Sequence, residues 1–238
     1  MRIFDSKLAR VLPPVLLIAT LIAVWWIVVA RSDSPIFPTP GQVATGAWAL
    51  AQDGTLWAHI EASLFRVEVG FGLAFLVAVP LGLWMGWVAG AFYTLNPLFQ
   101  MLRPISPIFL IFISSVFPMM VQTTVGVRTI DRRYLRAAAN FGVSRWVLFT
   151  RVVVPAVLPE IIVGMRIGLG VAWLVVVAAE MIALNTGLGY LIMDSRNAGN
   201  RYDLVIASMI IIGVIGLLLD GLTRLLEQLD IVKWRYVR

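Results

Sequence analysis

The sequence predicts an all-α, polytopic helical bundle that crosses a membrane, and three observations support this class. Of the 238 residues, 60% are hydrophobic and only 13% are charged, about half the charged share of a typical soluble domain. Five stretches reach the roughly 20 apolar residues that span a bilayer core. They cover residues 11–30, 69–88, 108–127, 152–184 and 204–219, and the apolar pattern of the last continues to Leu226. An ordinary soluble globule and a disordered chain are therefore excluded.

The first span has two possible interpretations. Basic residues precede it, and Val28-Val29-Ala30 resembles a signal-peptide cleavage site. Its apolar core is longer than the usual signal-peptide core, which favours an uncleaved membrane anchor. After it, Pro38-Thr39-Pro40 predicts a rigid turn, and residues 42–52 predict a short helix on the membrane surface. Trp48 and Trp57 would anchor that helix at the interface.

Charge in the loops predicts the orientation of the spans, because cytoplasmic loops are enriched in Lys and Arg. The N-terminal segment and the C-terminal tail are basic, so we expect both termini inside. Residues 32–63 contain three acids and no base apart from His59, and residues 185–203 are balanced, so we expect both segments outside. Residues 128–151 carry six arginines against Asp131 alone, which predicts the inside.

These orientations leave one crossing unexplained. If the first two spans return the chain to the inside, the span at 108–127 would carry the Arg-rich segment outside. An additional crossing is required between Val88 and Ile108, although residues 89–107 are a poor candidate because they contain Arg103 and three prolines. If a crossing is omitted after Pro107, that residue and Ile108 should lie about 30 Å apart, on opposite sides of the membrane. If the chain is continuous there, a true deletion or a different topology remains.

The Arg-rich segment predicts a compact helix-turn-helix within residues 132–146. Tyr134 to Asn140 are good helix formers, Gly142 can end that helix in a left-handed cap, and Ser144 can cap a second short helix. Pro155 marks the entry of the chain into the membrane. The small face made by Ala137 and its neighbour Ala138 suits the groove of a partner protein. A polybasic loop lying on anionic lipid is the alternative.

Polar groups inside the spans are candidates for a transport path. Arg166 and Glu180 are costly in lipid and should face protein or water. At fourteen residues apart, about 21 Å along a helix, they cannot pair with each other. Four side chains on the 108–127 span offer hydroxyl or amide groups to a small oxyanion: Ser114, Ser115, Gln122 and Thr123. Interhelical hydrogen bonds or snorkelling are the alternative role for all six residues, and we interpret Asp220 and Arg224 as a structural i, i+4 pair.

The Arg-rich segment resembles the EAA loop of ABC importer membrane subunits, which reads Glu-Ala-Ala, three residues, Gly, nine residues, Ile-x-Leu-Pro. Ala137, Ala138, Gly142 and Pro155 match that pattern, whereas Arg136 replaces the Glu; Val152 and Val154 replace the Ile and Leu. Between about residues 36 and 226 the chain also resembles the nitrate/sulfonate/taurine branch of the family. The matching segments are Phe37-Pro38-Thr39-Pro40, Leu56-Trp57, Ala62-Ser63-Leu64, Arg66-Val67, Pro80-Leu81-Gly82, Leu102 to Pro107, Ala178-Ala179-Glu180 and Gly187-Leu188-Gly189-Tyr190.

The resemblance implies a single transmembrane permease domain over residues 1–238, in the bacterial inner membrane, of the six-span family type with five spans evident here. The segment around Arg136 to Gly142 would be the cytoplasmic coupling helix, and Pro155 would belong to the same ATPase-coupling motif. The implied partners are two ABC ATPase subunits that hold ATP and Mg, a second permease subunit, normally in a homodimer, and a periplasmic or lipid-anchored solute-binding protein. The solute would be nitrate, a sulfonate, taurine or bicarbonate, or alternatively a heterocyclic vitamin precursor.

The resemblance breaks at the junction of Pro107 and Ile108, where the family has about one further helix. We therefore expect on the order of 20 residues to be missing at that point.

Other functional classes find little support in the residues. There is no Cys and only one His, His59, so no thiolate or multi-His metal site is expected. The lysines are Lys7 and Lys233, and neither lies in a P-loop, so no cofactor is expected in this chain. The arginines are interpreted as loop charges rather than a nucleic-acid surface. An intramembrane enzyme lacks a recognisable catalytic set, and a proton-coupled carrier would need more intramembrane acids than Glu180.

Overall fold

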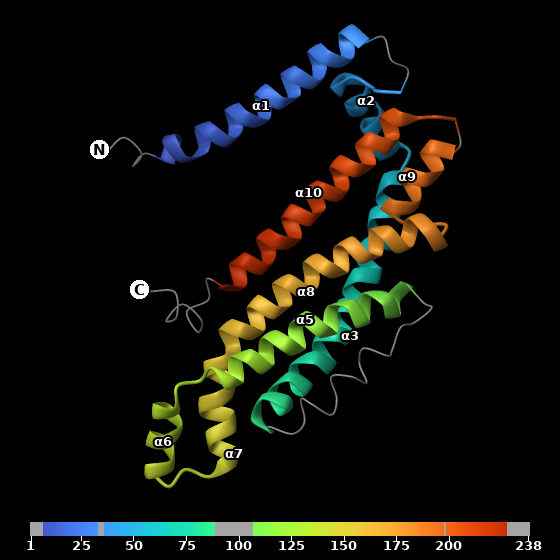
Figure 1. Cartoon of the computed structure of the whole chain (residues 1–238). Helices are drawn as coiled ribbons and strands as arrows, with labels where there is room; N and C mark the ends of the chain where they lie inside the picture. The colour runs from blue at the N-terminus through green and yellow to red at the C-terminus, as the bar shows by residue number, and fades with distance from the viewer. Residues whose placement is uncertain (1–6, 33–35, 89–106, 198, 228–238) are drawn as a thin grey trace.

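The computed structural model describes residues 7–32, 36–88, 107–197 and 199–227, and these residues form helices joined by short connections (Figure 1). In chain order they are α1 (Lys7–Ser32), α2 (Pro40–Gln52), α3 (Thr55–Trp87), α5 (Pro107–Arg128), α6 (Arg132–Asn140), α7 (Arg145–Leu148), the π-helical segment η1 (Phe149–Val153), α8 (Val154–Ala183), α9 (Leu188–Asn197) and α10 (Tyr202–Glu227). Five helical stretches of the described chain are long and apolar enough to cross a membrane. The predicted helical membrane class is confirmed.

Helix α1 stands beside the bundle rather than within it (Figure 1), and the apolar window of its span has no buried residue. It meets the next helix where the Trp26 ring lies against Gly41. The predicted short helix is present as α2. Thr39 caps it because its hydroxyl accepts a hydrogen bond from the backbone N–H of Gln42, while the Gln42 side chain accepts one from the Thr39 N–H. Trp48 and Trp57 are both exposed, as the predicted interfacial role requires.

Helices α3 and α5 pack side by side and run parallel, which decides the topology. Near the middle of α3, a Cβ on Gly70 would lie 2.7 Å from the Ile111 side chain; near the end of α3, a Cβ on Gly82 would lie 2.7 Å from Thr123. Both helices therefore end at the same end of the bundle. This direction for α5 agrees with the one that the loop charges predicted, because the chain must return between Val88 and Pro107.

The expected break at Pro107 is wrong. Pro107 and Ile108 are consecutive residues of one helix, α5, and a proline is well accommodated in a first helical turn. Pro107 therefore lies at the beginning of the span and not on the opposite side from Ile108. The additional crossing expected between Val88 and Ile108 concerns residues 89–106, which lie outside the described residues.

Helix α8 runs antiparallel to α5 and forms the centre of the bundle. Gly164 lies against Met119, and Gly168 lies against Met119 and Ser115, so the two backbones approach closely. On its other side α8 contacts α10, where the Trp173 indole donates a hydrogen bond to the Ile212 carbonyl at 3.1 Å. Segment 185–203, expected as a loop, contains helix α9, which packs against both α8 and α10.

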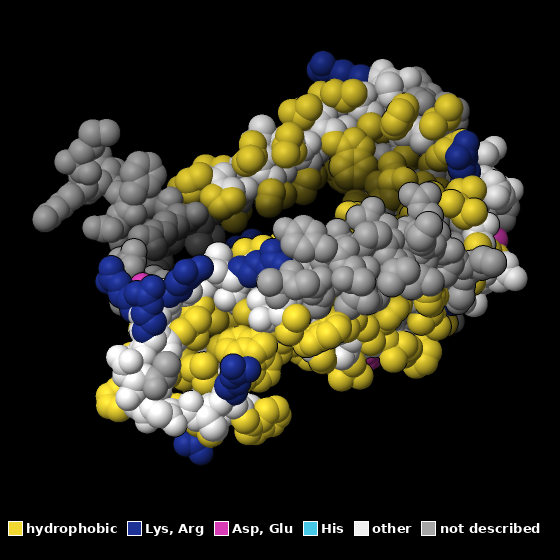
Figure 2. Space-filling view, turned by 60° about the horizontal axis from the view of Figure 1, so that its bottom comes forward, with side chains coloured by type: hydrophobic (Ala, Val, Ile, Leu, Met, Phe, Trp, Pro, Cys, Tyr) yellow, Lys and Arg dark blue, Asp and Glu magenta, His cyan; other side chains and the backbone are white. Residues whose placement is uncertain are grey.

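The beginning of α1, the end of α10 and the α6–α7 segment lie toward the same end of the molecule (Figure 1). We call this the loop end, and the opposite end, which holds α2 and α9, the α9 end. Figure 2 shows basic side chains gathered at the loop end, whereas hydrophobic side chains dominate the rest of the visible surface.

Candidate functional site

Helix α6 and the turn after it are built by local rules. Asp131 caps the helix because its carboxylate accepts a hydrogen bond from the Arg133 N–H at 2.8 Å. At the other end, the Val143 N–H donates to the Ala138 carbonyl, and Gly142 has φ +67°, which together form a Schellman cap. No heavy atom lies within 4 Å of a Cβ placed on Gly142. The backbone conformation, and not space within this chain, therefore favours glycine there.

The second helix of the turn continues directly into the membrane. Ser144 caps α7 by accepting a hydrogen bond from the Val147 N–H. The helical path then passes through η1 into α8, where Pro155 occupies the first turn and is exposed. From Arg145 to Ala183 the backbone is helical without interruption. A displacement of α7 is therefore passed directly to the span at the centre of the bundle.

The α6–α7 segment has one packed side and one exposed side. Leu135 packs against the buried cluster of Val127, Val153, Val157 and Ile161, which fixes α6 to the bundle. The exposed side carries aromatic residues that a free surface rarely shows: Phe141 is 86% exposed and Trp146 is 74% exposed. Arg136 and Ala137 are exposed on the same helix, and Ala138 is half-buried. The structure thus brings four of the predicted coupling residues to one helix and turn, whereas Pro155 lies at the start of α8.

The four predicted path residues on α5 occupy different surroundings. Ser115 and Thr123 are fully buried, and their hydroxyls donate to backbone carbonyls: Ser115 to Ile111 and Gly168, Thr123 to Met119. Ser114 and Gln122 are half-buried. Gln122 donates to the Glu160 carboxylate on α8, and Ser114 donates to the Ile111 carbonyl. The structure does not bring the four together around a common space.

Glu180, the fifth candidate, lies at the centre of a buried polar cluster near the α9 end. Its side chain has no exposed area, and Arg66 of α3 donates to its Oε1 from Nη1 at 2.6 Å. The Ser63 hydroxyl contacts both carboxylate oxygens and accepts a hydrogen bond from the Leu188 N–H at 2.9 Å. The Gly189 N–H donates to Oε2. The charge is thus paired and its oxygens are hydrogen-bonded, which a buried carboxylate requires.

The connection between α8 and α9 is shaped around this cluster. Gly187 has φ +112°, and a Cβ there would overlap the Glu180 carboxylate. Its N–H donates to Nδ1 of His59 at 2.9 Å, and Arg66 also donates to the Thr186 carbonyl at 3.0 Å. His59 therefore helps to fix the backbone of this connection.

Arg166, the sixth candidate, belongs to a second ionic group, between α8 and α10. Its Nε donates to Asp220 at 2.7 Å, and its Nη1 lies 3.4 Å from Glu227. Arg224 binds the other Asp220 oxygen at 2.8 Å, which confirms the predicted i, i+4 pair. Two positive and two negative groups therefore balance within this cluster.

The sequence interpretation missed Arg66 and the acidic partners of Arg166. Arg66 lies 114 residues before Glu180, so no local spacing connects them. A usable signal exists: a buried intramembrane acid requires a base, and Arg66 is the one Arg or Lys between Thr55 and Trp87. For Arg166, the signal was the presence of Asp220 and Glu227 seven residues apart near the end of α10.

A central helix held by one buried and one partly exposed ionic group, with a basic and aromatic helix-turn-helix at one end, fits a polytopic transport subunit. The family described as binding-protein-dependent transport system inner membrane components matches residues 6–229. The chain belongs to this family of ABC importer permeases. It is therefore a multi-pass inner-membrane transport component and not an enzyme, and its family implies ATPase and solute-binding-protein partners.

Three relatives illustrate the similarity. A nitrate import permease protein of Synechocystis sp. is 34% identical, with 92% of this chain and 89% of the relative covered. The taurine transport system permease protein of Escherichia coli is also 34% identical, over 89% of this chain and 86% of the relative. A putative aliphatic sulfonates transport permease protein of Bacillus subtilis is 31% identical, over 92% and 86%.

The alignments with these relatives also include positions at which this chain has no residue. The alignment with the nitrate permease has 247 positions, but 92% of 238 residues is only about 219, so about 28 positions have no counterpart here. For the taurine permease, 238 positions accommodate about 212 residues of this chain, which leaves about 26. This is somewhat more than the roughly 20 residues of one membrane helix, and it agrees with the expected shortening relative to the family.

Proposed function

We propose that this permease subunit moves a small anionic solute of the nitrate, sulfonate, taurine or bicarbonate class from periplasm to cytoplasm by alternating access. Three relatives that are named as nitrate, taurine and aliphatic sulfonate permeases support this class of solute. The observation that carries the mechanism is the α6–α7 helix-turn-helix, with its exposed arginines and aromatic residues and its unbroken connection to α8.

In this proposal residues 1–238 act as one permease domain, and residues 132–146 are its cytoplasmic coupling loop. Two ATPase subunits, which hold the ATP and Mg, contact the surface from Arg136 to Gly142. The helix from Arg145 to Ala183 is about 58 Å long at 1.5 Å per residue. Closure of the ATPase pair therefore tilts α8 against α5 and α10 and exposes the path to the cytoplasm.

The proposal places the loop end, with both termini, in the cytoplasm, because that end carries the excess of arginine. A second copy of this chain completes the path, and a periplasmic or lipid-anchored binding protein delivers the solute. Ser114 and Gln122 are the polar groups of α5 that we assign to the path. Solute choice rests largely with the binding protein, because the described partners of Arg166 neutralise its charge.

The test is reconstitution with the co-expressed ATPase and binding protein. We expect ATP-dependent uptake of at least one labelled anion among nitrate, taurine, an alkanesulfonate and bicarbonate, and stimulation of ATP hydrolysis by the loaded binding protein. Uptake driven by a proton gradient without ATP, or uptake of a neutral heterocycle alone, would contradict the proposal.

Orientation can be tested separately, because the natural sequence has no cysteine. A membrane-impermeant maleimide should label Asp53→Cys in intact cells and Arg133→Cys only after permeabilisation. The reverse pattern would overturn the proposed orientation and leave the transport class untouched.

A further inference from the structure

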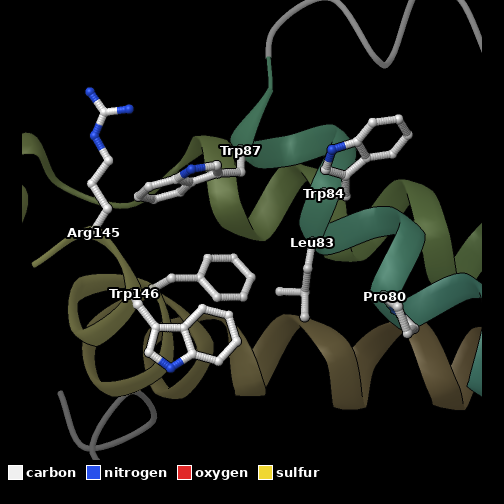
Figure 3. Close-up of a pocket in the computed structure, with 7 residues that line it drawn as sticks. Pro80, Leu83, Trp84, Trp87, Arg145 and Trp146 are labelled. Atoms are coloured by element: carbon white, nitrogen blue, oxygen red, sulfur yellow. The ribbon is translucent and has the colours of Figure 1, made fainter.

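An apolar groove lies at the loop end, between the last turns of α3 and the beginning of α7. It has a volume of about 600 Å³, within the roughly 300–1,000 Å³ of small-molecule sites. Its walls are Pro80, Leu83, Trp84 and Trp87 from α3, and Trp146 and Phe149 from α7 and η1, with Arg145 as the one charged lining residue. Figure 3 shows Leu83 and Trp84 of α3 across the groove from Trp146, with Trp87 and Arg145 toward one end of it.

The walls of the groove are fixed independently of any occupant. Trp87 and Phe149 meet edge to face, with ring centroids 5.6 Å apart and planes at 76°, a favourable geometry for an aromatic pair. Phe149 also packs against the buried cluster that holds α6. The groove is thus a formed feature that joins a membrane span to the coupling segment.

The groove lies at the height of a membrane interface. Helix α3 is a span and ends at Trp87, while α7 leads through η1 into the span of α8. Trp84 is half exposed and Trp146 is 74% exposed, as expected for tryptophans in an interfacial belt. An occupant can therefore enter from the bilayer without leaving the hydrocarbon region.

The chemistry of the lining selects one kind of occupant. Apolar and aromatic walls suit an acyl chain, and Arg145, which makes no ion pair with any described residue, suits an anion at the end of that chain. The segment around it has five further arginines against Asp131 alone. We propose that the groove binds one anionic phospholipid, with an acyl chain between the α3 wall and Trp146 and its phosphate against the Arg145 guanidinium.

The selectivity of this site comes from the head group. An acyl chain gains little by moving from the bilayer into an apolar groove, because lipid tails are as apolar as the groove walls. One arginine near a membrane surface favours an anionic head group about five-fold, which corresponds to about 1 kcal/mol. The lipid holds α7 against α3 and so stabilises the loop that must transmit force.

Brominated lipids test the proposal, because bromine on an acyl chain quenches tryptophan on contact. The full-length chain is placed in phosphatidylcholine vesicles with equal small fractions of brominated phosphatidylglycerol or brominated phosphatidylcholine. We expect greater quenching by the anionic lipid, with about five-fold higher occupancy. The excess should disappear in Arg145→Gln and decrease in Trp146→Phe.

Two matched variants make the result specific. Arg133→Gln removes the same charge from the same loop, but outside the groove, and should retain the excess; Trp48→Phe removes an exposed tryptophan near the α9 end and should retain it too. Equal loss of the excess in Arg133→Gln would overturn the site in favour of a diffuse polybasic attraction. Absence of any excess in the wild-type protein would also overturn it, and would mean that the groove is filled by another segment of this chain, by a second copy or by no specific lipid. None of these outcomes bears on the transported solute.

Discussion

The two ends of α8 handle charge in opposite ways. Near its C-terminal end, Glu180 is fully buried and each of its oxygens has a partner from α3 or from the start of α9. At its N-terminal end, α8 continues directly from the α6–α7 segment, whose arginines and aromatic rings are exposed. A buried ion pair fixes one arrangement because separating it is costly, whereas exposed charges leave a surface ready for a partner. We interpret the C-terminal end of α8 as the end anchored in the bundle and the N-terminal end as the end on which a partner protein acts.

The largest effect on stability is expected at the anchored C-terminal end of α8. Glu180→Ala should leave the largely buried Arg66 without its carboxylate partner and lower the free energy of unfolding by about 3–5 kcal/mol. Thermal unfolding of the purified protein, followed by tryptophan fluorescence, measures this loss. Ser63→Ala is a milder variant that removes a hydroxyl and should cost about 1–3 kcal/mol. Equal stability of Glu180→Ala and wild type would show that the cluster does not hold the helices together.

The next largest effect is expected in the α6–α7 segment, and it should alter function rather than stability. Gly142→Asp should insert normally but lose co-purification of the ATPase and ATP-driven uptake. Gly142→Asn is the matched control, because Asn has the shape of Asp without its charge and tolerates the left-handed conformation. If Asn is accepted and Asp is not, charge at the docking surface is the cause; if both fail, the partner leaves no room for a side chain. Unchanged co-purification and uptake in Gly142→Asp would contradict the proposal that residues 132–146 couple the permease to the ATPase.

The smallest effect is expected for Arg166→Gln. Asp220 keeps its contact with Arg224, so we expect a stability loss of about 1 kcal/mol or less, as for partly exposed ion pairs. Uptake of anionic and neutral solutes should change equally. A selective decrease in anion uptake, with normal assembly, would instead place Arg166 in the solute path.

Local rules predicted much of the fold, and long-range contacts account for what they missed. The span at 108–127 was predicted almost residue by residue, as was the turn at Gly142 and Ser144, because hydropathy and capping are properties of neighbouring residues. The helix that contains the 69–88 span begins fourteen residues earlier, at Thr55. Charged residues such as Arg66 end a hydropathy window, but the helix continues through them once a partner elsewhere neutralises the charge.

For the candidate site, too, local patterns predicted some features and long-range contacts account for the rest. Spacing and composition predicted the helix and turn of the proposed coupling segment, and the structure contains both. The ionic partners of Glu180 and Arg166 are set by contacts over 114 and 54 residues, which no local pattern contains. The loop charges predicted the parallel direction of α3 and α5 that is observed, but they could not say whether the chain lacks a crossing between these two helices.

The parallel contact of α3 and α5 bears on how this family can change its length. The two helices are held against each other by their own glycine contacts, so contacts within the described residues suffice to align them. Loop length alone costs only about 0.6 kcal/mol per doubling. Insertions and deletions between Trp87 and Pro107 are therefore tolerated so long as the remaining residues still reach from one end of the pair to the other. A chain shorter than its relatives can in this way retain the same core, and this junction is a natural place to graft a segment of different length.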